Sequence, residues 1–202
     1  MQQNMIRTVT VYAGSATRAP APLLALAHDL GAGIAARGWV LVYGGATIGL
    51  MGAVADAALA GGGRVEGVIL DTFARVAHGG LHDLATVTDM RSRKAGLAHR
   101  GDAFVALPGG FGTLEELSEI LVERQLGMHA KPLIVVDHEG FWNPLRQLID
   151  GQIARGLVKE KYRDLVTFVP DAQTALARLD EAAAVDASAS ALPATAKIDD
   201  TR

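Results

Sequence analysis

The chain has 202 residues, half of them apolar, and 19 basic against 22 acidic side chains give a formal net charge of −3. This length suffices for one well-buried core but is short for two full domains, so we expect a single domain over residues 1–182. The nearly balanced charge argues against a general attraction to nucleic acid or anionic lipid. The absence of cysteine excludes disulfides, thiolate metal sites and cysteine nucleophiles.

The N-terminal segment 1–7 is polar, and the apolar stretch 9–13 that follows it is too short for the hydrophobic region of a signal peptide. No apolar run approaches the ~20 residues that cross a bilayer. We therefore expect a soluble, cytoplasmic protein without a membrane partner.

Short β-branched runs alternate with longer segments rich in Ala and Leu along the chain, a pattern typical of βαβ units. The expected strands are Arg7–Tyr12, Trp39–Tyr43, Val65–Leu70, Ala103–Leu107, Leu133–Val136 and Leu165–Phe168. The expected helices are Pro22–Arg37, Leu50–Ala60, Arg91–His99, Leu114–Leu126, Phe141–Ala154 and Asp171–Ala183. The pattern predicts an α/β fold with a doubly wound parallel sheet between two helical layers.

From about Ala182 onward the sequence consists largely of Ala, Ser, Asp, Thr and Pro. Such a composition offers little apolar surface to offset the entropy of ordering. We expect residues 183–202 to form a disordered tail.

The strongest local signal is the run LPGGFGTLEE at 107–116, which joins an expected strand to an amphipathic helix. Its glycines allow backbone N–H groups to converge, and the helix adds its positive N-terminal end, so the turn suits a phosphate. Thr113 adds a hydroxyl donor. The alternative is a tight strand-to-helix turn that binds no ligand.

Glu116 has two interpretations, which spacing leaves about even. In the sequence TLEE it fits a capping box, where its side chain returns a hydrogen bond to the backbone N–H of Thr113. Leu114, Leu117 and Leu121 form the expected apolar stripe, and Glu116 points away from that stripe, toward solvent or the crevice. A capping glutamate needs no catalytic role.

Arg93 lies between Met90 and Leu97 on the side of a helix that is expected to face inward. A guanidinium there needs an anionic partner, because an unpaired buried charge is costly. Arg93 is therefore a better ligand candidate than Arg91, whose side chain should face water. The alternative is an internal ion pair with a carboxylate of the chain itself.

Two further small-residue turns follow expected strands. The run YGGATIGLMG at 43–52 opens a helix, and its Gly44 and Gly45 are placed to contact the same ligand from the adjoining strand end. Ser15, after the first strand, is a candidate donor to a phosphate or ribose. Both signals are weaker than the run at 107–116, because glycine-rich turns of this kind are also common packing devices.

Several motif matches are rejected on their context. The run GAGIAA at 31–36 fits a loose dinucleotide pattern but lies within an expected helix, where the mechanism of that motif does not apply. His78 and His82 are four residues apart, yet Gly79 and Gly80 between them argue against a helix and hence against a metal site. No P-loop run and no GxSxG elbow is present.

Together, the PGGFGTLEE run at 108–116, the Arg93-Lys94 pair and the Gly44-Gly45 turn resemble the LOG family. Members of that family are cytokinin riboside 5′-monophosphate phosphoribohydrolases, often labelled lysine decarboxylases, and the likeness covers about 8–168. It implies a Rossmann-like fold, a homodimer or larger assembly, and an active site near the subunit interface. No cofactor is expected, since no pyridoxal-phosphate pattern supports the decarboxylase label.

The resemblance implies that Arg93 and Glu116 are catalytic. It thereby favours the catalytic interpretation of Glu116 over the capping box, which spacing alone left open. With neighbours from the glycine-rich turns, the expected substrate-binding set is Ser15, Gly44, Gly45, Met90, Lys94, Gly110, Phe111, Gly112, Thr113, Leu114 and Glu115. No metal is expected.

The sequence departs from the family at Ala46, where a third glycine is often found, and in the loop 72–82, which lacks a glutamate of the plant members. These departures leave the substituent on the base open.

The resulting hypothesis is hydrolysis of the N-glycosidic bond of a purine nucleoside 5′-monophosphate. The turn at 110–113 would hold the phosphate and place C1′ near Glu116, whose carboxylate would stabilise the charge on the ribose and help activate water. A rival is a non-catalytic carrier of a nucleotide or the molybdenum cofactor, which has no need of the pair. A DNA-processing protein is disfavoured, because aromatic residues do not interleave with basic ones.

Overall fold

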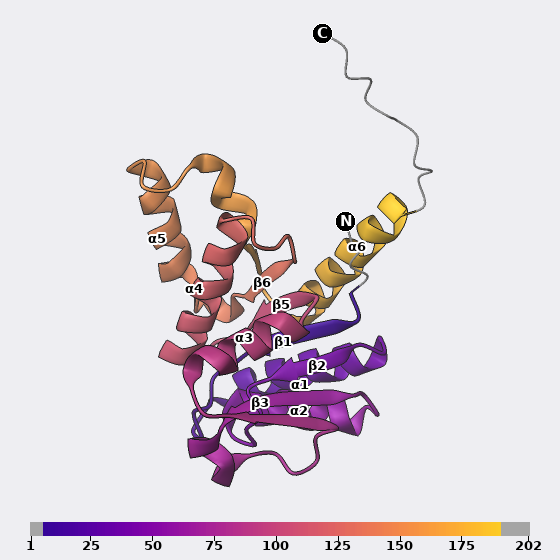
Figure 1. Cartoon of the computed structure of the whole chain (residues 1–202). Helices are drawn as coiled ribbons and strands as arrows, with labels where there is room; N and C mark the ends of the chain where they lie inside the picture. Colours follow the sequence, from indigo (N-terminus) through magenta and orange to yellow (C-terminus); the bar gives the residue numbers. More distant parts are fainter. Residues whose placement is uncertain (1–5, 191–202) are drawn as a thin grey trace.

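The structure is a computed structural model and describes residues 6–190. Seven strands of this part of the chain form one sheet in the order β4-β3-β2-β1-β5-β6-β7 (Figure 1). The strands are β1 Thr8–Tyr12, β2 Val40–Tyr43, β3 Val65–Leu70, β4 Asp83–Val87, β5 Ala103–Ala106, β6 Leu133–Val136 and β7 Thr167–Val169. Every pairing between them is parallel. The chain winds outward from β1 to β4 and then returns to the other side of β1, so the winding reverses between β1 and β5.

Helices cover both faces of the sheet, which confirms the predicted three-layer, doubly wound fold (Figure 1). The main helices are α1 Ala21–Ala36, α2 Gly49–Ala60, α3 Met90–Arg100, α4 Phe111–Gln125, α5 Asn143–Ala154 and α6 Ala172–Ser190. Short 3-10 helices are η1 Asp71–Val76, η2 His138–Gly140 and η3 Glu160–Leu165. One apolar cluster joins α1, α2 and α6 to the sheet, and a second joins α3, α4 and α5 to its other face.

Strands β5 and β6 are apolar along their whole length because both of their faces are buried. In β5, Ala103 and Val105 belong to the first cluster, whereas Phe104 and Ala106 belong to the second. Alternate side chains of a strand point to opposite faces, so one short strand contributes to both cores. This arrangement fixes where β5 ends and hence where the turn at 107–110 lies.

The run GAGIAA is a helix-packing segment, since it lies inside α1. A Cβ on Gly31 would overlap the backbone of Val54 in α2. The glycine therefore lets the two helices approach closely, and the rejection of a dinucleotide motif is confirmed.

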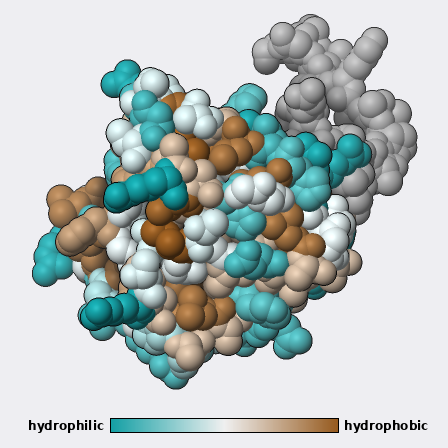
Figure 2. Space-filling view, turned by 90° about the horizontal axis from the view of Figure 1, so that it is seen from below, coloured by the Kyte–Doolittle hydropathy of each residue, from teal (hydrophilic) through white to brown (hydrophobic). Residues whose placement is uncertain are grey.

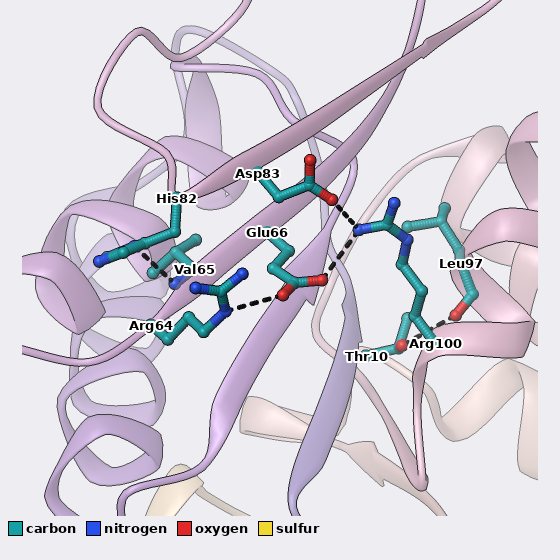
Figure 3. Close-up of polar contacts among 8 residues, drawn as sticks. All are labelled: Thr10, Arg64, Val65, Glu66, His82, Asp83, Leu97 and Arg100. Atoms are coloured by element: carbon teal, nitrogen blue, oxygen red, sulfur yellow. Dashed lines mark hydrogen bonds and ion pairs between the residues drawn. The ribbon is translucent and has the colours of Figure 1, made fainter.

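The edge strand β4 was not predicted from the sequence, because it is partly exposed and its pattern of apolar and polar residues is mixed. Its first residue, Asp83, joins a network of ion pairs at the amino ends of β3 and β4 (Figure 3). Arg100 Nη1 donates to Asp83 Oδ2 over 2.6 Å and to Glu66 Oε2 over 2.8 Å. Arg64 Nε donates to Glu66 Oε1 over 2.9 Å. The end of α3 is thereby tied to the sheet edge on the side away from the strand ends that carry the glycine-rich turns.

The predicted disordered tail begins too early. Helix α6 continues past residue 183 as far as Ser190, and Ala182 and Ala183 still pack against the first apolar cluster. Alanine has the highest helix propensity, which sustains the helix where apolar bulk is scarce. The rest of that prediction, 191–202, lies outside the described residues.

The surface seen in Figure 2 carries apolar side chains in separate groups among hydrophilic ones. Scattered exposed apolar residues are normal for a folded chain and need no functional explanation. Among the described residues, no helix combines the length and apolarity needed to span a membrane.

Candidate active site

A pocket opens at the carboxyl ends of β1, β2 and β5, where the winding of the sheet reverses. Open α/β sheets place their ligands at this point. Segments far apart in the sequence contribute to its wall, which consists of Ala13, Gly14, Ser15, Gly44, Ala46, Ile48, Met51, Ile69, Phe73, Val76, Met90, Arg93, Gly110, Phe111, Gly112, Thr113 and Glu116. Both residues expected to be catalytic therefore line one pocket.

Arg93 and Glu116 form a buried ion pair inside this pocket. Arg93 Nη1 donates to Glu116 Oε1 over 2.7 Å, and the two side chains are 13% and 8% exposed. Arg93 is held by α3 and Glu116 by α4. Of the two alternatives for Arg93, the structure shows the internal ion pair, and the carboxylate partner is the other residue expected to be catalytic.

Burial raises the pKa of the Glu116 carboxyl, and the Arg93 guanidinium opposes that rise without cancelling it. Glu115 adds to the increase in this pKa, while Lys94 acts against it. A buried carboxylate whose pKa is raised toward neutrality is better matched to proton transfer than an exposed one. The arrangement therefore suits a general base or a group that stabilises developing positive charge.

The capping-box interpretation of Glu116 is wrong. Helix α4 begins at Phe111 with Gly110 as its N-cap, so Glu116 lies beyond the first turn. The predicted apolar stripe is also displaced, since Leu114 is 38% exposed. The inward face of α4 instead carries Thr113, Glu116, Leu117 and Ile120. The helix begins three residues earlier than predicted, and this start turns Glu116 into the pocket.

The N-terminus of α4 is open toward the pocket. The first backbone N–H that bonds within the helix here is that of Leu114, which donates to Gly110 O over 3.1 Å. The N–H groups of Phe111, Gly112 and Thr113 precede it, and all three residues line the pocket. Such N–H groups and the helix dipole make a site for an anion such as a phosphate.

The N-terminus of α2, in contrast, is closed by the chain itself. The carbonyl oxygen of Gly14 accepts hydrogen bonds from the N–H groups of Leu50 and Met51 at 2.9 and 3.3 Å. Gly49, with φ +62°, packs so tightly that a Cβ would lie 2.7 Å from the carbonyl carbon of Ser15. Of these two helix ends, α4 is therefore the one that can receive an anion. Ser15 stays exposed at the rim of the pocket.

The two glycines after β2 have different surroundings. Gly44 lines the pocket. Gly45 does not; it has φ +78° and packs against Ile69 and Leu84. A left-handed backbone explains why glycine stands at this position. Its expected contact with the substrate is not supported by this placement.

Lys94, Glu115 and Leu114 were expected to bind substrate but lie outside the pocket wall. Lys94 Nζ pairs with Glu115 and with Glu119, each at 2.9 Å, and these hydrogen bonds raise the pKa of the ammonium group. Leu114 lines a separate apolar groove between α4 and α5. Met90 does line the pocket, and Arg91 is exposed as predicted.

The apolar wall of the pocket was not predicted from the sequence; it consists of Ile48, Met51, Ile69, Phe73 and Val76. Two of these residues belong to η1, which the chain holds beside the β2–α2 turn. Thr47 N donates to Val76 O, and His78 N donates to Gly45 O, both over 2.9 Å. The sequence does carry a signal for this wall, since apolar side chains recur in 69–76, at the end of β3 and in the η1 segment that follows it.

The two histidines rejected as metal ligands have separate partners. His78 Nε2 lies 2.9 Å from Asp56 Oδ1, and His82 Nδ1 accepts from the backbone N–H of Val65 over 3.2 Å (Figure 3). Within the described residues, no three histidine, aspartate or glutamate side chains converge as a metal site would require.

The fold and the site define a doubly wound α/β protein with an anion-suited pocket at the switch point and a buried Arg–Glu pair within it. The chain belongs to the LOG family: the family model described as "Possible lysine decarboxylase" matches residues 51–179. A rice protein, probable cytokinin riboside 5′-monophosphate phosphoribohydrolase LOGL9, is 40% identical over 90% of this chain and 81% of its own length. The cytokinin riboside 5′-monophosphate phosphoribohydrolase of Rhodococcoides fascians is 40% identical over 86% of this chain and 89% of its own.

Solved structures share the fold at lower sequence identity. The molybdenum cofactor carrier protein of Chlamydomonas reinhardtii is 21% identical and superposes with a TM-score of 0.70, covering 88% of this chain and 98% of its own. The molybdenum cofactor binding protein of Rippkaea orientalis gives a TM-score of 0.67 at 21% identity, covering 87% and 96%. At such identities the likeness shows the fold alone, because one fold hosts many functions.

Proposed function

We propose that this protein hydrolyses the N-glycosidic bond of an adenosine 5′-monophosphate, plain or N6-substituted, to the free base and ribose 5-phosphate. The observation that carries the proposal is the Arg93–Glu116 pair, buried beside the open N-terminus of α4. The names of the relatives, cytokinin riboside 5′-monophosphate phosphoribohydrolases at about 40% identity, support the same reaction.

The substrate phosphate binds at the N–H groups of Phe111, Gly112 and Thr113. Its binding energy holds the ribose in one place, so that C1′ lies beside Glu116. As the C1′–N9 bond breaks, positive charge develops on the ribose ring, and the carboxylate of Glu116 stabilises that charge. Glu116 takes a proton from the attacking water, whose oxygen bonds to C1′, and passes this proton on to the departing purine, so that the products are the free base and ribose 5-phosphate. Arg93 fixes the orientation of the carboxylate through the 2.7 Å hydrogen bond.

The apolar wall of the pocket supports a purine as the leaving group. Ile48, Met51 and Phe73 come from the β2–α2 turn, α2 and η1 and face the same cavity as the pair. Apolar side chains of this kind cover the faces of an aromatic base, while a few polar groups fix its orientation.

A carrier of a nucleotide would use the N-terminus of α4 equally well. It would gain nothing from a buried ion pair at the pocket wall, because burying two charges is costly unless they serve the site. The Arg93–Glu116 pair in the pocket wall, where burial also raises the pKa of Glu116, therefore favours the enzyme over a carrier.

The test incubates the protein with AMP and with its N6-isopentenyl analogue, and follows free base and ribose 5-phosphate by liquid chromatography. Adenosine, which lacks the phosphate, is the control substrate. We expect release of base from the monophosphates and much less from adenosine. Tight binding of AMP without any free base would contradict the proposal and favour a carrier.

We also propose that the protein is a homodimer or a larger assembly of identical chains. Exposed apolar side chains gather beside the pocket: Phe111 is 93% exposed and Leu148 57% exposed, and both line the groove between α4 and α5. Gly110 and Phe111 border both this groove and the pocket, which supports an interface next to the active site. An apolar patch of this kind is typical of association surfaces.

Sedimentation velocity tests the assembly. Leu148→Glu places a charge in the groove and should shift the protein to a monomer. Leu157→Glu is the control, because Leu157 is 75% exposed and lies outside the groove. A wild-type protein that sediments as a monomer throughout the micromolar range would contradict the assembly.

A further inference from the structure

Gly44 lies so close to Arg93 that a side chain at position 44 would displace the guanidinium or the thioether of Met51. A Cβ on Gly44 would stand 2.5 Å from Arg93 Nη2 and 2.7 Å from Met51 Sδ. Real Cβ atoms essentially never approach a heavy atom within 3.0 Å. Because glycine has no side chain, a slot remains beside its Cα. The guanidinium of Arg93 occupies this slot, and Met51 borders it.

We propose that Gly44 is a positioning residue for Arg93: its missing side chain makes the slot that seats Nη2 while Nη1 reaches Glu116. The inference rests on the proposed function and assigns Gly44 a role other than the substrate contact expected from the sequence. This role gives a reason for glycine at position 44, where the backbone is not left-handed.

Space, and not backbone conformation, is what glycine supplies at this position. The backbone of Gly44 is not in the left-handed region, whereas that of Gly45 is, with φ +78°. The turn is also fixed on both sides, because Tyr43 pairs with Gly67 in the sheet and Gly45 O accepts the N–H of His78. The φ of Gly44 therefore does not itself call for glycine, and the cost of an alanine falls on the two side chains that its methyl group meets, Arg93 and Met51.

A shift of the guanidinium acts directly on its ion pair with Glu116. Arg93 is 13% exposed, and its bond to Glu116 is 2.7 Å long. A shift of Nη2 away from a methyl group at position 44 turns the planar guanidinium and lengthens or breaks the bond made by Nη1, since both nitrogens move together. A displacement of about 1 Å at a catalytic group costs on the order of 100-fold in rate.

The charge state of Glu116 reports the position of the guanidinium. The charged or titratable groups that face this carboxyl are Arg93 and Lys94 from α3, Glu115 on α4 and Tyr12 from β1. Arg93 is the largest influence that lowers the pKa of Glu116. Moving the guanidinium away therefore raises this pKa further, and Glu116 stays protonated up to a higher pH.

The experiment compares Gly44→Ala, Arg93→Ala, the double variant Gly44→Ala/Arg93→Ala, and Gly79→Ala as a matched control. Gly79 has no positive φ, and a Cβ there would meet nothing within 4 Å. We expect kcat for AMP to fall on the order of 100-fold in Gly44→Ala and to stay unchanged in Gly79→Ala. In the double variant, the loss should match that of Arg93→Ala to within about twofold, because residues that act through one another are not additive.

A titration of Glu116 by carbon-13 NMR provides a second readout that needs no turnover. The midpoint should rise in Gly44→Ala and in Arg93→Ala, and stay at the wild-type value in Gly79→Ala. An unchanged midpoint in Gly44→Ala, or losses that simply multiply in the double variant, would overturn the positioning role. A wild-type protein without turnover would instead contradict the proposed function, and the titration would still decide the role of Gly44.

Gly44→Ala creates two close contacts at once, so melting by circular dichroism checks that this variant folds. If it does not fold, Gly44→Ala/Met51→Ala is compared with Met51→Ala, because removing the thioether leaves only the contact with Arg93. The same fall in kcat and the same rise in the Glu116 midpoint are expected. Equal behaviour of these two variants would overturn the proposal.

Discussion

Arg93 on α3 donates a 2.7 Å hydrogen bond to Glu116 on α4, although the two residues are 23 positions apart in the chain. Both residues line the pocket that opens at the carboxyl ends of β1, β2 and β5, at the switch point of the sheet. Two sequence motifs that lie on separate helices thus meet at one place. Their meeting beside an open helix N-terminus combines an anion site with a buried carboxylate.

The pH dependence of the reaction should report Glu116. Burial raises the pKa of this carboxyl above its ordinary value, and in the proposed reaction the ionised form is the active one. Activity should therefore be lost as the pH falls through the raised pKa, at a higher pH than for an exposed glutamate. A profile of kcat/KM for AMP against pH measures the midpoint of this acid limb. A limb at or below the ordinary glutamate range would show that burial does not control the reacting group.

The phosphate site is tested by removing one backbone N–H. Phe111 is the first residue of α4 and its side chain is exposed. The comparison uses Phe111→Pro and Phe111→Ala, because both variants lack the phenyl ring. Proline is tolerated at this helix position, and only the proline variant lacks the N–H. Loss of one charge-assisted hydrogen bond, worth about 1.5 kcal/mol, should raise KM for AMP roughly tenfold over the alanine variant.

Adenosine is the control for that comparison, since it has no phosphate for the N–H to bind. The two variants should process it equally. A tenfold difference on adenosine as well would point to a distorted helix rather than a lost phosphate contact.

The ion-pair network at the sheet edge should contribute to stability and not to activity. Arg100 bonds both Glu66 and Asp83 (Figure 3), at the amino ends of strands whose carboxyl ends face the pocket. Arg100→Ala should lower the free energy of unfolding by about 1 kcal/mol, and less at high salt. Urea denaturation of the wild-type protein and of Arg100→Ala measures this difference in the free energy of unfolding.

Arg178→Ala provides the comparison, because Arg178 makes an exposed pair with Glu181 on one helix. It should change stability less than Arg100→Ala does. Equal stability of the two variants, or a loss of turnover in Arg100→Ala, would contradict the assignment of the network to the edge of the sheet.

The fold was largely predictable, because alternating apolar runs mark strands that are buried on both faces. Val65–Leu70 and Leu133–Val136 were predicted with the observed bounds. The edge strand Asp83–Val87 was missed since one of its faces meets solvent and its pattern is mixed. Helix α6 ends at Ser190, beyond its predicted end at Ala183. Alanine favours the helix in this segment, whereas the segment's composition alone predicted disorder.

The candidate site was predictable where a motif determines the local backbone structure. The glycines at 109–112 mark the start of α4, and the side of α3 that faces inward followed from the spacing around Arg93. The orientation of Glu116 did not follow, because it depends on which residue begins α4, and a shift of a few residues turns the helix face. The apolar wall around Phe73 was missed, as only the folded chain brings η1 to the pocket.

Glu116 is the residue on which the proposed hydrolysis depends most, and Glu116→Gln tests its role most directly. Glutamine keeps the size of the side chain and an oxygen that can accept from Arg93, so the protein should fold and still bind AMP, as calorimetry would show. Release of adenine, followed by liquid chromatography, should fall by roughly 100-fold or more, the contribution of a general base. Release of adenine at the wild-type rate by this folded variant would contradict the central role of the Arg93–Glu116 pair.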